Sequence, residues 1–112
     1  SVSAFSPIAN PIKSKWGQKQ FTAYLGADST IWQDYDPSIL IRKFGFETKI
    51  LIDQGQDDNF LDLLMPGSLS NQFDENNALG EFRYQPGYDH TYFFVSTFMR
   101  DHIKHHAEIL LN

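Results

Sequence analysis

The 112-residue sequence contains no cysteine. Disulfide bonds and thiolate chemistry are therefore excluded, and the absence is in keeping with a cytoplasmic protein. Lys and Arg number nine against fourteen Asp and Glu, which gives a formal net charge of −5, and no stretch is strongly basic. Nucleic acids and membrane surfaces are therefore not expected as partners. No apolar run approaches the ~20 residues that a membrane-spanning helix needs.

The N-terminus also lacks an initiator Met, a basic region and the apolar core of a signal peptide. It opens instead on residues 1–5, SVSAF, a pattern typical of a β-strand. A chain that begins inside a strand is expected to be a piece of a longer protein. Its length allows one domain at most, and 41% hydrophobic residues suffice for a small core.

The strongest pattern lies in residues 85–111, where a Pro-Gly turn and His90 precede a long run without Gly or Pro. From Thr91 onward, apolar residues recur at helical spacing, which predicts one amphipathic helix of about 20 residues, roughly 30 Å long. Its broad apolar stripe is formed by Tyr92, Phe94, Val95, Phe98, Met99, His102, Ile103, His106, Ile109 and Leu110. We expect the aromatic run 92–94 to belong to the core.

Strands and helices alternate along the rest of the chain. Expected strands cover residues 2–5, 48–53 and 81–84, and expected helices cover 18–25, 37–43 and a short stretch from 60 to 64. Trp16 and Gly17 are assigned to a loop, and 66–78 to a weakly helical or irregular segment. This alternation predicts an α/β fold with a mainly parallel sheet covered by helices. Three strands make a thin sheet, so we expect the C-terminal end of a larger one.

Two turns follow the carboxyl ends of the second and third expected strands, where open parallel sheets bind ligands. The first turn carries Asp53, Asp57 and Asp58, and the second carries Asp89 and His90. An acid after one strand and a His after the next match the second half of a Ser…Asp…His arrangement. A carboxylate is needed there because it fixes the tautomer of the imidazole that accepts the proton of the nucleophile. The pattern leaves open which acid acts, and His90 could equally be a turn residue or a helix cap.

The nucleophile of such a triad is missing from the sequence. No G-x-S-x-G occurs, and the nearest stretch, Gly67-Ser68-Leu69-Ser70, lacks both the pattern and a preceding strand. The segment by itself is therefore expected to be inactive.

Four blocks resemble successive parts of the S-formylglutathione hydrolase (esterase D) family: SVSAFSPIANP, WGQKQFTAYLG, ILIDQGQDDNFL and QPGYDHTYFFVSTFMRDHIKHHAEIL. The resemblance runs over nearly the whole chain. It implies that residues 1–112 are the C-terminal portion of a single α/β-hydrolase domain, with the family's nucleophile elbow upstream and outside this chain. It also implies that His90 is the catalytic base and that Asp58, with Asp57 as its nearest competitor, is the catalytic acid. Asp89 is expected to order the turn or cap the helix.

The same resemblance implies a cytoplasmic serine hydrolase that cleaves S-formylglutathione, in formaldehyde detoxification, and short carboxylic esters. Its partners would be that small-molecule substrate and the N-terminal part of the same enzyme, and a homodimer is compatible with the family. No metal or organic cofactor is implied. The alternative is a non-catalytic truncated remnant, or an interaction fragment that packs on another chain.

Three further patterns have competing interpretations. His102 and His106 have a spacing that can bind zinc, but no third ligand is evident, so packed and hydrogen-bonded histidines are favoured. The acidic turn 53–59 lacks the spacing of an EF-hand calcium loop. Trp16 either lines a substrate cleft or covers the core.

Overall fold

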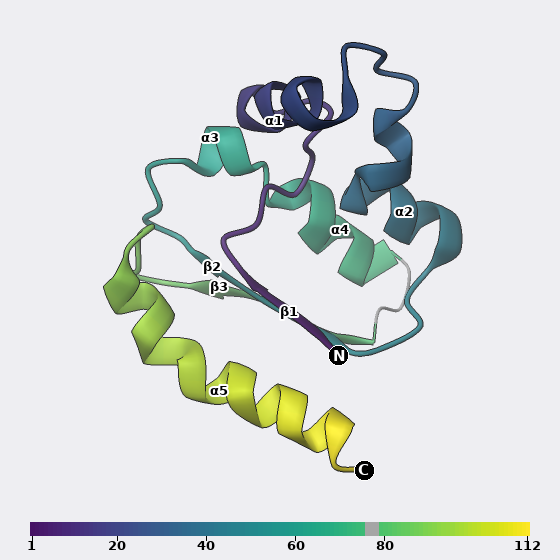
Figure 1. Cartoon of the computed structure of the whole chain (residues 1–112). Helices are drawn as coiled ribbons and strands as arrows, with labels where there is room; N and C mark the ends of the chain where they lie inside the picture. The colour runs from purple at the N-terminus through teal and green to yellow at the C-terminus, as the bar shows by residue number, and fades with distance from the viewer. Residues whose placement is uncertain (76–78) are drawn as a thin grey trace.

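The computed structural model describes residues 1–75 and 79–112, in which a three-stranded sheet lies between helices (Figure 1). The elements in chain order are β1 (Val2–Phe5), α1 (Lys15–Leu25), the 3₁₀ helix η1 (Trp32–Tyr35), α2 (Pro37–Phe44), β2 (Ile50–Gly55), α3 (Leu61–Leu64), α4 (Gly67–Glu75), β3 (Gly80–Gln85) and α5 (Tyr92–Leu110). Figure 1 shows α5 along one face of the sheet and α1 to α4 on the opposite side. The predicted α/β class is confirmed. Residues 76–78 of the segment expected to be weakly helical lie outside the described residues.

The sheet is parallel throughout, in line with the predicted mainly parallel sheet, and its strands lie in the order β1-β2-β3. The side chains of the central strand β2 point alternately to the two faces of the sheet, and both faces are buried there. Ile52 packs with Leu69 of α4, whereas Asp53 contacts α5 on the other side. The ladder between β2 and β3 extends to the pair Gly55–Gln85, so β2 ends two residues later than the sequence pattern indicated. The acidic turn therefore begins only at Gln56.

Helix α1 begins three residues earlier than predicted and includes Trp16 and Gly17. Ser14 caps it, because its side-chain oxygen accepts a hydrogen bond from the backbone N–H of Gly17. Gly17 is required inside this first turn, since a Cβ atom would lie 2.3 Å from the backbone of Pro11. The loop assignment of these residues was wrong because this contact is invisible in the local sequence.

The prediction of the long C-terminal helix is confirmed by α5, but the prediction of its core residues is only partly right. Phe94 and His102 are buried, whereas Tyr92 is 82% exposed and Phe93 69% exposed. Helix α5 packs on β1 and β2, and several residues of its apolar stripe remain exposed. The expectation that the whole aromatic run is core is therefore wrong. No helix among the described residues is long and apolar enough to cross a membrane.

Candidate active site

The turns after β2 and β3 are joined to each other through their backbones. The N–H of Gln56 donates to the carbonyl of Gln85 at 3.0 Å, and the N–H of Asp57 donates to that of Tyr88 at 2.9 Å. At Gly55 the turns come so close that an added Cβ atom would lie 2.4 Å from the Tyr88 carbonyl oxygen. Only glycine fits this close approach. The acid and the histidine of the sequence pattern are thus carried on a single joined edge of the sheet.

Asp58 is the acid that meets His90. Its Oδ2 lies 2.9 Å from Nδ1 of His90, and its side chain is fully buried. The same Oδ2 accepts a hydrogen bond from Nε2 of Gln54 at 2.9 Å, while Oδ1 accepts one from the backbone N–H of Phe60 at 2.7 Å. Asp57 is exposed and contributes its backbone to the turn instead. The structure therefore separates two neighbouring acids that the spacing pattern left as alternatives.

His90 combines a fixed orientation with access from outside. Its side chain is 37% exposed, and the ring of Phe60 meets it edge to face with centroids 5.3 Å apart. Because Nδ1 faces Asp58, Nε2 is the nitrogen left to exchange a proton with another group. His90 also lines a cavity of about 330 Å³ together with Phe5, Ser6 and Phe94. Ser6 adopts the left-handed backbone region, with φ of 48°, directly after β1.

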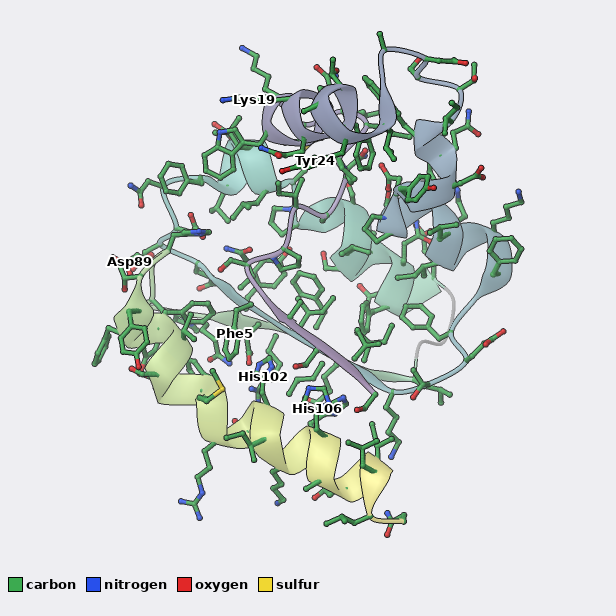
Figure 2. All side chains as sticks on the ribbon, viewed as in Figure 1. Phe5, Lys19, Tyr24, Asp89, His102 and His106 are labelled. Carbon is green, nitrogen blue, oxygen red and sulfur yellow. The ribbon has the colours of Figure 1, made fainter. Side chains whose placement is uncertain are left out.

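Trp16 lies one ring farther from the histidine. Its indole is 4.8 Å, centroid to centroid, from the ring of Phe60, which in turn contacts His90. Its role in a substrate cleft stays a prediction. Asp89 accepts a hydrogen bond from the hydroxyl of Thr91 at 2.6 Å, so it orders the turn, as expected. Figure 2 shows Asp89 in the turn that precedes α5.

Sequence reasoning missed the contributions of Gln54, Gly55 and Phe60. An Asp followed two residues later by a free backbone N–H is a known turn signal, so the hydrogen bond to Phe60 was detectable. A glycine at the end of a buried strand was likewise a sign of close backbone approach. Nothing in the local sequence indicated that the amide of Gln54 points at Asp58, because that contact depends on how the turn after β2 folds back.

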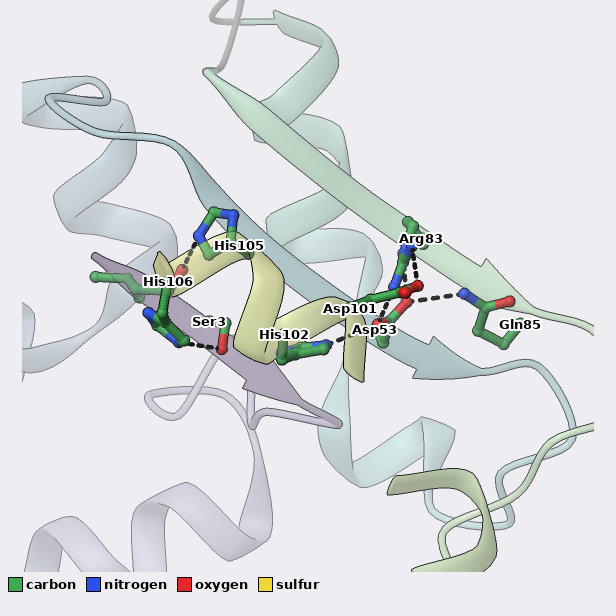
Figure 3. A network of polar contacts seen from close by, with 9 residues as sticks. Ser3, Asp53, Arg83, Gln85, Asp101, His102, His105 and His106 are labelled. Atoms are coloured by element: carbon green, nitrogen blue, oxygen red, sulfur yellow. Dashed lines mark hydrogen bonds and ion pairs between the residues drawn. The ribbon is translucent and has the colours of Figure 1, made fainter. Parts of the chain in front are cut away.

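A second Asp–His contact joins β2 of the sheet to α5 (Figure 3). Oδ2 of Asp53 is 2.7 Å from Nε2 of His102, and both side chains are almost fully buried. Arg83 donates to both carboxylate oxygens, at 2.8 and 2.6 Å, and Gln85 donates to Oδ1 at 2.9 Å. A further bond of 3.0 Å joins Arg83 to Asp101. This Asp53 network ties β2, β3 and α5 together.

Burial and charge act in opposite directions within the Asp53 network. Burial by itself would raise the pKa of Asp53, but hydrogen bonds from Arg83, Gln85 and His102 outweigh it and lower that pKa below its usual value. Burial lowers the pKa of His102, and the neighbouring Asp53 offsets this only in part. The ring of His102 also stacks on Phe5, with centroids 3.8 Å apart. His102 is therefore a neutral, packed histidine.

The favoured interpretation of the helix histidines agrees with these contacts. His106, one turn beyond His102, has its Nε2 2.9 Å from the hydroxyl of Ser3 (Figures 2 and 3). His102 and His106 thus contact different groups, Asp53 and Ser3. Within residues 1–75 and 79–112, no group of three or more His, Asp or Glu side chains is arranged to hold a metal ion.

Comparison with known proteins gives a consistent answer. The esterase family model ("Putative esterase") matches residues 1–105. The S-formylglutathione hydrolase of Paracoccus denitrificans is 56% identical over 110 residues, and that of Arabidopsis thaliana is 49% identical over 112 residues. Each match covers 98% of this chain, and the chain spans 39% of the length of either relative.

Among solved structures, an S-formylglutathione hydrolase from Agrobacterium tumefaciens superposes with a TM-score of 0.85 at 39% identity. The superposition covers 96% of this chain and 39% of that one. The parallel sheet, the helices on both of its faces and the acid and histidine turns at one edge are thus part of an α/β-hydrolase fold. The chain belongs to the esterase family.

Proposed function

We propose that this chain supplies the acid, Asp58, and the base, His90, of a serine hydrolase that cleaves S-formylglutathione to glutathione and formate and also acts on short carboxylic esters. The observation that carries the proposal is the 2.9 Å contact between the buried Asp58 carboxylate and Nδ1 of the accessible His90. The identity to relatives named S-formylglutathione hydrolase supports this choice of substrate.

In this proposal, residues 1–112 are the C-terminal portion of a single α/β-hydrolase domain, and the nucleophilic serine and the oxyanion donors come from the remainder of that domain. The share of 39% that the chain covers in its relatives supports this division. The joined turns after β2 and β3 would then present the acid and base to a serine held by a neighbouring strand.

The chemistry follows from the free nitrogen of His90. Nε2 accepts the proton of the serine hydroxyl while the serine oxygen forms a bond to the formyl carbon of the thioester. Asp58 holds the resulting imidazolium in place. The carbon–sulfur bond then breaks, and His90 returns the proton to the departing thiolate of glutathione. Water, activated by the same nitrogen, releases formate from the formyl-enzyme and restores the serine. The sequence of steps requires no metal or organic cofactor.

The wider role that we infer is formaldehyde detoxification in the cytoplasm. S-formylglutathione is the thioester that results when the adduct of formaldehyde and glutathione is oxidised. The absence of cysteine supports a reducing compartment. A homodimer is part of the same proposal and is testable by light scattering.

One observation favours a second candidate, an interaction fragment without catalysis. Helix α5 exposes a large part of its apolar stripe, with Tyr92 at 82% and Ile103 at 63% exposure. Exposed apolar surface of this kind is typical of a face that packs on another chain. The two candidates differ in whether a reactive serine accompanies His90.

Labelling with a fluorophosphonate separates them, because this probe reacts only with an activated serine. We expect the full-length protein that contains this chain to be labelled at one serine outside residues 1–112, as mapped by peptide mass spectrometry. His90→Ala should abolish labelling. The matched control His105→Ala should retain it, because His105 lies on α5 and contacts the carbonyl of Val2 and the ring of His106. A full-length protein that neither labels nor hydrolyses a chromogenic acetate ester would favour the interaction fragment.

A further inference from the structure

Gln54 is a buried polar residue that the proposed catalytic cycle does not use. It lies at the carboxyl end of β2 and is 0% exposed. Because side chains alternate along a strand, it points to the face opposite Asp53. Its Nε2 donates to the carbonyl of Gly55 at 3.1 Å and to Oδ2 of Asp58 at 2.9 Å.

In the contact between Gln54 and Asp58, the donor and the acceptor are defined. An ionised carboxylate can only accept hydrogen bonds, so the amide must present its NH₂ group to Asp58. Oδ1 of Asp58 is already held by the backbone N–H of Phe60, and Oδ2 is shared between Gln54 and His90. Without the amide, the carboxylate would keep two of these three contacts, and its Oδ2 would be positioned by His90 alone.

Only one end of the Gln54 amide is satisfied by hydrogen bonds. Within the described part of the chain, its Oε1 is buried and has no hydrogen-bond partner. A buried acceptor without a partner destabilises a protein, and a methionine of similar volume would fill the same space without that cost. The groups that gain from the amide are its two acceptors, the Gly55 carbonyl and Asp58, and of these Asp58 is the one that contacts His90.

We propose that Gln54 is a positioning residue: its amide fixes Oδ2 of Asp58 so that the carboxylate keeps His90 in the tautomer with the proton on Nδ1. The inference rests on the proposed function for its effect on rate, and on the observed contacts for its effect on His90. Two independent consequences follow. Removal of the amide should slow the chemical step while substrate binding is unchanged, and it should alter the hydrogen bond between Asp58 and His90.

The test compares Gln54→Met with the native full-length protein, with Gln72→Met as the matched control. Gln72 is also a buried glutamine, but it lies on α4, which packs on α2 and β3. We expect Gln54→Met to lower kcat for the acetate ester by about tenfold to a hundredfold, the range expected for a misplaced catalytic group, with KM nearly unchanged. Its thermal unfolding temperature should change little, because the variant removes the unpaired Oε1 together with the two hydrogen bonds of Nε2.

The second readout is the low-field proton resonance of the hydrogen-bonded Nδ1–H of His90, identified by its loss in His90→Ala. Gln54→Met should shift or broaden this signal, and Gln72→Met should leave it in place. A native resonance and a native kcat in Gln54→Met would overturn the inference. So would a loss of activity that comes with a lowered unfolding temperature and an unmoved resonance, since that pattern marks a purely structural role. If the native protein itself neither hydrolyses the ester nor labels, the proposed function fails, and the resonance still decides whether Gln54 holds the Asp58–His90 pair.

Discussion

Two Asp–His pairs lie near each other in this chain, and their contacts are of nearly equal length. Asp58 meets His90 at 2.9 Å, and Asp53 meets His102 at 2.7 Å. The first histidine is 37% exposed and lines a cavity, whereas the second is 3% exposed and stacks on Phe5. A short Asp–His contact is thus a poor indicator of catalysis by itself.

The partners of the two acids explain the difference. Asp53 forms an ion pair with Arg83, and this cation neutralises the charge of the carboxylate. Little negative charge therefore remains to stabilise an imidazolium. Among the residues that the structure describes, the donors to Asp58 besides His90 are neutral, namely the amide of Gln54 and the N–H of Phe60. A carboxylate surrounded by neutral donors keeps its charge available for the histidine. The first pair is suited to proton transfer, and the second is suited to holding β2, β3 and α5 together.

The largest effect that we predict is on the first pair. Asp58→Asn should lower kcat by about 10⁴-fold, because the amide presents a donor where Gln54, Phe60 and His90 all need an acceptor and so favours the wrong tautomer of His90. Ester hydrolysis by the full-length protein measures it. Asp57→Asn is the matched control and should keep native activity, since Asp57 is exposed. Loss of activity in Asp57→Asn with native activity in Asp58→Asn would make Asp57 the catalytic acid, and the contrast between the two Asp–His pairs would then be wrong.

The second pair should respond in stability and not in rate. Asp53→Ala leaves Arg83 and His102 without their buried acceptor, so we expect a loss of about 3 to 5 kcal/mol in the free energy of unfolding. Asp101→Ala removes the other partner of Arg83, whose side chain is 51% exposed, and should cost less than about 1 kcal/mol. Urea unfolding measures both. If kcat per folded molecule of Asp53→Ala fell as far as that of Asp58→Asn, the division of roles between the pairs would be wrong.

The smallest predicted effect is the pH dependence of stability. Burial lowers the pKa of His102 in the folded state, so below its usual value of about 6.5 the unfolded chain binds a proton that the folded chain does not. The contribution of His102 is therefore complete above about pH 6.5 and falls as the pH decreases, by at most about 1.4 kcal/mol per pH unit. The lowered pKa of Asp53 acts in a separate range, below its usual value near 3.8.

Urea unfolding in steps from about pH 7.5 to 5.5 measures this decline. His102→Gln keeps a donor for Asp53 but has no titrating group, so its decline should be shallower than that of the native protein. An equal decline in both proteins would mean that another group causes it, and His102 would then not be the neutral member of the second pair.

The sequence predicted the elements better than their contacts. The strand pattern of residues 2–5 and the apolar periodicity after Thr91 placed β1 and α5, because both signals arise from local alternation of side chains. The start of α1 was missed because Gly17 looked like a loop residue. It lies in the helix, where the backbone of Pro11 leaves no room for a side chain. Exposure of Tyr92 and Phe93 was missed because a helical wheel does not say how much of a stripe a neighbouring sheet can cover.

For the candidate site, the order of an acid turn and a His turn was readable, since carboxyl ends of parallel strands share one edge. The spacing left Asp57 beside Asp58, and only the fold of the turn shows which side chain points to His90. The amide of Gln54 was not predictable at all, because its partner is defined by the way the chain returns after β2.

The close approach at Gly55 has a consequence for motion. Because the turns of the acid and the base are bonded backbone to backbone, a displacement of one carries the other with it. Thermal fluctuations should then move Asp58 and His90 as one body relative to the sheet, so that their mutual distance varies less than the distance of either to a group on another strand. In the catalytic cycle proposed above, the alignment that remains to be achieved would be that between this rigid pair and the nucleophile.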